Sequence, residues 1–172
     1  MSIINDLVVR VNDLEQRLDR LADVEIPPFE IGCRLRNSSD IAAADSSAVI
    51  LTFDTELFDT DSMHSTVTNT DRITINTPGK YAIWGNVQWE INTAGRRNIA
   101  LRLNGDGVNE LAVTELGADP ITTAVVVQTV STIYDLAAGD YLQLKVLQTS
   151  GGSLDVISRS HYSPVLAAWR LA

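Results

Sequence analysis

The sequence has few of the residues on which most enzymatic sites depend. Its 172 residues include one cysteine and two histidines, and aromatic residues make up only 6%. Cys33 has no partner for an intrachain disulfide, so we expect a small buried hydrophobe in a protein made in a reducing compartment. His64 and His161 stand in polar, turn-like stretches without a Gly-x-Ser-x-Gly, phosphate-loop or His-x-x-x-His pattern. We therefore expect both to be surface or loop residues, and a protein that is not an enzyme.

A surplus of basic residues is also missing. The chain has 13 Lys and Arg against 22 Asp and Glu, a formal net charge of −9. This balance argues against binding to nucleic acid or to an anionic membrane. No apolar run approaches the roughly 18 residues of a membrane span, and Asp6, Arg10 and Asp13 interrupt any secretory signal. We expect synthesis in the cytoplasm, no membrane insertion and no cofactor.

The amino-acid composition of the chain changes at Pro27-Pro28. Helix-forming residues crowd the first 26 positions, whereas Thr, Val, Ile, Asn, Asp and Gly dominate the remainder. The sequence therefore predicts a helical stalk over residues 1–26, a proline linker over 27–30 and a globular head over 31–172. Because proline is fixed in φ and disfavoured inside helices, the two prolines are expected to end the stalk.

The stalk has the apolar spacing of a coiled coil. Arg10 at a g position and Glu15 at the following e position can pair between neighbouring chains. The stretch Arg10–Glu15 also resembles the short trimerisation motif of natural coiled coils, an Arg, two apolar core residues and a Glu. An amphipathic helix lying on the head, with a wider apolar stripe, is the alternative. The seam residues, spaced 3, 4, 3, 4 and 3 apart, are Ile4, Leu7, Val11, Leu14, Leu18 and Leu21.

Such a short stalk is not expected to hold an oligomer by itself. Burying six seam side chains contributes about 1.5–3 kcal/mol each. Ordering the backbone costs about 1–2 kcal/mol for each of roughly 20 residues. We therefore predict that the head forms a homotrimer as well.

The head has the pattern of a mostly β protein. Asn104-Gly105 favours a tight hairpin, and Gly151-Gly152 marks a further sharp turn. About nine or ten strands without a credible helix predict an antiparallel sandwich. The expected strands cover residues 49–53, 72–75, 80–91, 98–103, 108–116, 122–136, 140–148, 154–158 and 164–171.

One expected strand carries an uninterrupted apolar segment. Residues 124–127 are apolar at every position, which is typical of a strand buried on both faces. The opposite sheet of a sandwich covers only one face. We therefore expect Val125, Val126 and Val127 to lie along a trimer axis, where other subunits cover the second face.

Several short patterns in the head resemble those of one family. They are Gly79-Lys80-Tyr81-Ala82-Ile83 with Ile73 six residues earlier, Phe53 with Asp59, Leu136-x-x-Gly139-Asp140-x-Leu142, and the closing Ser163-Pro164 strand. Together they resemble the globular head shared by complement subcomponent q and tumour necrosis factor (TNF). The stretches FDTELFDT and PGKYAI are similar to the phage and bacterial versions of this head.

The resemblance implies a TNF-like, trimeric jelly roll in which both termini of the head lie on one side, often after a stalk. The predicted fold is therefore an antiparallel jelly-roll sandwich preceded by a short coiled-coil helix. His64 and Thr66 fall where the animal members carry a large aromatic residue. We expect the loop between Asp59 and Arg72 to differ, and the animal proteins' ligands not to carry over.

Two groups of residues leave a binding role open. Asp54, Glu56, Asp59 and Asp61 form the densest acidic cluster, which predicts either a solvated strand–loop edge or converging oxygen ligands for calcium.

The aromatic residues allow sugar stacking, but Trp84 and Trp89 are an odd number of positions apart. Residues so spaced point to opposite faces of a regular strand. Core and interface positions are therefore favoured over a single sugar-binding platform.

These expectations lead to a hypothesis about function. The chain is a non-enzymatic structural protein of a bacteriophage virion, displayed on the particle surface as a capsid decoration or head fibre. Its N-terminal end attaches to other virion proteins. The alternative is the tip of a tail fibre that binds a receptor or glycan on the host surface. A hydrolase acting on a cell-surface polymer is supported only by scattered carboxylates.

Overall fold

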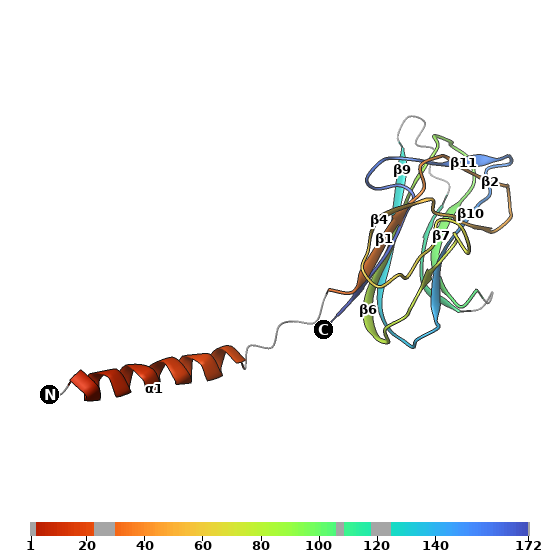
Figure 1. The fold of residues 1–172 in the computed structure, drawn as a ribbon. Coiled ribbons are helices and arrows are strands. Elements are labelled where there is room, and N and C mark those ends of the chain that lie inside the picture. The colour runs from red at the N-terminus through yellow and green to blue at the C-terminus, as the bar shows by residue number, and fades with distance from the viewer. Residues whose placement is uncertain (1–2, 23–29, 106–108, 118–124, 172) are drawn as a thin grey trace.

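In the structure, a computed structural model, the described residues are 3–22, 30–105, 109–117 and 125–171. Helix α1 (Ile3–Ala22) precedes a head of two antiparallel β-sheets (Figure 1). The predicted stalk helix is therefore present. The side chains of residues 4, 5 and 18–22 lie outside what the structure describes, as do residues 23–29 with the two prolines.

The larger sheet has seven strands around a long central strand. Strand β6 pairs with β9 along one edge and with β12 and β11 along the other, and the order continues outward through β1 to β4 and through β11 to β2. The strands are β1 (Gly32–Arg36), β2 (Ile41–Ala43), β4 (Thr55–Asp59), β6 (Gly79–Trp89), β9 (Val126–Leu136), β11 (Leu154–Ile157) and β12 (Val165–Arg170).

The smaller sheet has five strands and packs against the larger one. Its order is β3-β10-β7-β8, with β5 also paired to β10. The strands are β3 (Val49–Ile50), β5 (Ile73–Thr74), β7 (Arg97–Leu103), β8 (Glu110–Leu116) and β10 (Tyr141–Gln148). The mostly β, antiparallel sandwich with a short N-terminal helix is confirmed.

The described residues form twelve strands, more than the nine or ten predicted. Each predicted range overlaps a strand of the structure, but β1, β2 and β4 were not predicted. In β1, Arg34 and Arg36 alternate with the buried Cys33 and Leu35, so the segment has a polar sequence. Its strand conformation comes from pairing with β12 and β4, which lie far along the chain. Non-local pairing of this kind leaves little trace in local sequence.

The inward faces of both sheets form one hydrophobic core. Strand β6 alternates regularly, with Tyr81, Ile83 and Val87 buried between less buried neighbours. A Cβ added to Gly85 would lie 2.3 Å from Cδ1 of Leu144. Glycine at this position therefore allows β10 to approach β6 closely.

A buried polar side chain joins the two sheets at one end. The Trp89 indole Nε1 donates to Oε1 of Gln128 at 2.7 Å. The Nε2 of Gln128 donates in turn to the Thr114 carbonyl oxygen at 3.1 Å and the Arg97 carbonyl oxygen at 3.2 Å. Buried polar groups with partners of this kind fix one arrangement of the strands.

The first and last strands of the head lie side by side. Gly32 pairs with Trp169, and the Arg170 amide donates to the Ile31 carbonyl oxygen at 2.8 Å. The chain therefore enters and leaves the head at the same end (Figure 1). This agrees with the placement of termini that the family resemblance implied.

Candidate interaction surfaces

The predicted coiled-coil seam is exposed within one chain. The described seam residues Leu7, Val11 and Leu14 are 61%, 47% and 55% exposed. No described residue of this chain covers them, so the helix presents an apolar stripe without a partner. Arg10 and Glu15 are exposed beside this stripe. The seam side chains of Ile4, Leu18 and Leu21 lie outside the described part of the chain.

Within the described residues, no helix is both long and apolar enough to cross a membrane.

Strand β9 carries two exposed apolar side chains, Val127 and Ile133, in an outer row that also contains Thr129, Ser131 and Asp135. Its pairing with β6 places Val127 opposite Gln88 and Ile133 opposite Ala82 on the outer face of the seven-stranded sheet. Val127 is 47% exposed and Ile133 is 63% exposed. Such exposure is unusual for β-branched residues in a long strand. The face of an antiparallel sheet that contacts water normally carries polar side chains.

The predicted trimer-axis segment divides between the two faces of this sheet. Val126 pairs with Trp89 and packs against the core, whereas Val125 and Val127 are about half exposed. The neighbouring strands β6 and β12 extend the outer surface with further apolar residues. We call this outer surface the apolar sheet face, made of Phe58, Ala82, Trp84, Val125, Val127, Ile133 and Trp169. Val165 and Ala167 lie on the same side of β12 but are buried within the chain.

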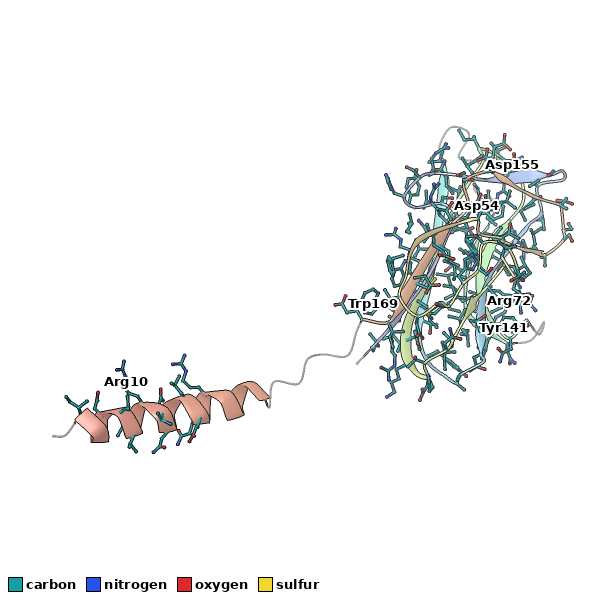
Figure 2. The ribbon with its side chains drawn as sticks, in the orientation of Figure 1. Arg10, Asp54, Arg72, Tyr141, Asp155 and Trp169 are labelled. Atoms are coloured by element: carbon teal, nitrogen blue, oxygen red, sulfur yellow. The ribbon has the colours of Figure 1, made fainter. Side chains whose placement is uncertain are left out.

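Aromatic residues anchor the other side of the apolar sheet face. Phe58 on β4 meets Trp169 on β12 edge to face, with ring centres 5.7 Å apart. Trp169 lies beside the start of β1 (Figure 2). Trp84 lies on this face whereas Trp89 is fully buried in the core, so their predicted separation onto opposite faces is confirmed.

One loop folds back onto the apolar sheet face. The Tyr162 hydroxyl donates to Oε1 of Gln88 at 2.7 Å, and the Asn86 amide donates to the Tyr162 carbonyl oxygen at 2.8 Å. Arg34 Nη2 donates to the His161 carbonyl oxygen at 2.8 Å. These bonds hold residues 158–163 over one side of the face and leave Ile133 open.

The outer face of the five-stranded sheet is more polar than the apolar sheet face. Lys145 forms an ion pair with Glu110, and Gln143 donates to the carboxylate of Asp71. Burial and the nearby Arg102 lower the pKa of Lys145. These charged and polar groups suit contact with water, although Val113 is 48% exposed on the same face.

The four predicted acidic residues do not gather around a common point. The Asp54 carboxylate accepts hydrogen bonds from the amide and hydroxyl of Ser38, and Asp61 accepts one from the Thr77 amide at 3.2 Å. Across the described ranges, no three His, Cys, Asp or Glu side chains lie together as metal ligands. The cluster therefore provides turn and loop contacts.

Neither histidine is arranged as a catalytic base. The two ring nitrogens of His64 lie 2.8 Å from the Arg72 carbonyl oxygen and 3.3 Å from the Phe53 carbonyl oxygen. His64 is a half-buried loop residue, and His161 is exposed. Burial and the nearby Asp59 and Glu56 raise the pKa of the Cys33 thiol, which keeps it protonated and unreactive.

The role of Arg97 was not predicted from the sequence. This residue is only 4% exposed, and its guanidinium donates to the carbonyl oxygens of Asn92, Ala94 and Arg96 at 2.8–3.3 Å. Burial lowers its pKa, and its Cζ lies 5.8 Å from the centre of the Trp89 ring. Arg97 thereby fixes the loop between β6 and β7.

Comparisons with known proteins identify the fold. No family model matches the sequence, and no curated protein matches it. Among solved structures, murine APRIL at pH 8.0 aligns with a TM-score of 0.62 and 14% identity, covering 83% of this chain and 99% of that one. Eiger TNF from S. frugiperda aligns with a TM-score of 0.59 and 12% identity, covering 83% and 93%. The head therefore has a TNF-like jelly-roll fold.

Proposed function

We propose that the chain is a non-enzymatic structural protein of a bacteriophage virion that works as a homotrimer. Three jelly-roll heads stand on a coiled-coil stalk, and the N-terminal end of the stalk attaches to other virion proteins. The trimer is displayed on the particle surface as a capsid decoration or head fibre.

One observation carries the proposal. A single chain leaves two apolar surfaces uncovered, the α1 seam around Val11 and the apolar sheet face around Val127 and Ile133. Both lose contact with water if three copies associate around one axis, because the seam residues meet along the stalk while the sheet faces meet between the heads. Removal of apolar area from water is the main driving force for such association.

The two surfaces are expected to act together. A helix of 20 residues gains most of its stability from packing its apolar face. A trimeric head brings three helices together at a high local concentration, so that association within the stalk becomes an intramolecular step. The resemblance to trimeric TNF-like heads supports the same number of chains.

Attachment to a virus is supported by the arrangement of a head after a short helical stalk and by the sequence resemblance. The stretches FDTELFDT and PGKYAI are similar to those of phage members of the family. In the structure these stretches form β4 with its neighbours and the start of β6, both in the seven-stranded sheet. The short stalk favours a decoration close to a capsid surface over a long tail fibre.

The test is to locate the protein on particles of the virus that encodes it. We expect cryo-electron microscopy to show threefold projections with heads outermost, and antibody against the head to label the capsid surface. Particles that lack the protein would overturn the proposal. Labelling confined to the tail tip would instead favour the alternative, a receptor- or glycan-binding tail fibre.

A further inference from the structure

A polar hollow of about 180 Å³ opens on the head between the end of β4 and the residues that follow β5. A single stretch of chain, within residues 62–76, supplies its wall. This is the loop that the sequence predicted to differ from the animal proteins. Hydroxyl and amide side chains line most of the hollow, namely Ser62, Ser65, Thr68, Asn69, Thr74 and Asn76.

Hydrogen bonds hold this loop in shape without a ligand. The carboxylate of Asp59 accepts from the amides of Met63 and His64 at 3.0 and 2.9 Å. The His64 ring then lies between the carbonyl oxygens of Arg72 and Phe53. Because the wall is already ordered, a ligand loses less free energy to ordering the protein than it would with a loose loop.

Several polar groups at the hollow remain without partners among the described residues. They are the hydroxyls of Ser62 and Thr74, the side-chain amide of Asn69, Oδ1 of Asn76 and the terminal guanidinium nitrogens of Arg72. Other atoms of two of these side chains are bonded: Arg72 Nε donates to Asp71, and Asn76 Nδ2 donates to the carbonyl oxygens of Asp61 and Ser62. The set contains both donors and acceptors.

Arg72 is fixed in position beside the hollow. Its Cζ lies 4.2 Å from the centre of the Tyr141 ring, and its Nε donates to Asp71 at 3.2 Å. Figure 2 shows Arg72 next to Tyr141 on the head. The terminal nitrogens remain available for a hydrogen-bond acceptor in a defined place.

The surrounding charge selects the class of ligand. Asp59 ends β4, and Asp61 and Asp71 lie on the loop that follows, so Arg72 has acidic neighbours that disfavour an anion. A neutral polyol avoids this repulsion, and its hydroxyl groups can both donate to amide oxygens and accept from the guanidinium. We propose that the hollow binds one unit of a neutral saccharide. This inference concerns a single head, so it rests on neither the trimer nor the virion role.

The inference can be tested by nuclear magnetic resonance with the full-length protein. The probes are the methyl glycosides of glucose, galactose, mannose and N-acetylglucosamine. We expect at least one to shift backbone amides within residues 61–76, with a dissociation constant of about 1 mM, typical of a weak single-site contact.

Two substitutions remove hydroxyl or amide groups from the wall. Ser62 and Asn69 have positive φ values of 51° and 52°, so Ser62→Gly and Asn69→Gly keep the backbone unstrained. Each should weaken glycoside binding at least tenfold. Ser46→Gly is the matched control, because Ser46 has a φ of 53° and lies outside the hollow. It should bind as the parent protein does.

Titration of the parent protein tests binding even if a variant fails to fold. Thermal denaturation shows which variants are folded. No amide shifts with any of the four glycosides would overturn the proposal. Shifts with N-acetylneuraminate or sulfate in their place would also overturn it, because the site would then select an anion. Equal binding by Ser62→Gly, Asn69→Gly and the control would place the sugar elsewhere.

Discussion

Ile133→Asp tests whether the apolar sheet face is an interface. Ile133 is 63% exposed in one chain, and full burial of such a side chain contributes about 1.5–3 kcal/mol. Covering the exposed part therefore contributes about 1–2 kcal/mol per chain, or about 3–6 kcal/mol per trimer. At about 1.4 kcal/mol per factor of ten, its loss weakens the trimer by roughly 10²–10⁴-fold. Burial of the new carboxylate adds to this effect.

Sedimentation equilibrium over a dilution series measures this change directly. Val67→Asp is the control, because Val67 is 83% exposed on a loop and is not one of the residues of the apolar sheet face. The control should leave association unchanged and should unfold in urea within about 0.5 kcal/mol of the parent protein. Ile133→Asp should unfold more easily than the parent at concentrations where the parent is trimeric, because association stabilises the folded chain. Association of Ile133→Asp as tight as that of the control would refute the assignment of this face.

Three further predictions concern the head alone. Arg97→Met leaves three carbonyl oxygens without their donor and should lower the free energy of unfolding in urea by about 2 kcal/mol or more; unchanged stability would contradict its structural role. Cys33 should resist thiol reagents at pH 8 until the protein unfolds, and stability should fall as pH rises above 9.0, because the raised pKa opposes ionisation in the folded state only. Burial raises the pKa of Asp54, but hydrogen bonds from Ser38 and Thr55 outweigh it and lower the pKa below 3.8. The carboxylate therefore stabilises the fold above that pH and loses its contribution as pH falls through the folded value, a loss that Asp54→Asn should abolish.

The long alternating segments made most of the fold predictable. The stretch that forms β6 and the one that forms β9 carry a two-residue period. Asn104 and Gly105 have the positive φ values of a turn, 56° and 66°, but the connection from β7 to β8 is longer than the predicted tight hairpin, and its residues 106–108 lie outside the described part of the chain. Strands β1 and β4 were missed because they contain charged residues, and β2 was missed because it has only three residues. The partners of β1 and β2 lie far along the chain. Local patterns do not record such pairing.

The candidate surfaces were predictable only in part. An apolar run at residues 124–127 indicated an interface, and the same two-residue period could have extended it to Ile133. The hollow could not be predicted, because it depends on how Asp59 and His64 fold one loop back on itself. Arg97 was missed for a similar reason, since nothing in the sequence distinguishes it from the exposed Arg96 next to it.

The mass of the full-length protein in solution tests the central claim most directly. Light scattering at tens of micromolar should give three times the chain mass of 18.7 kDa, about 56 kDa. A chain shortened to residues 30–172 should form a weaker trimer, because it lacks the seam formed by Leu7, Val11 and Leu14. A full-length protein that remains at the mass of one chain would contradict the account.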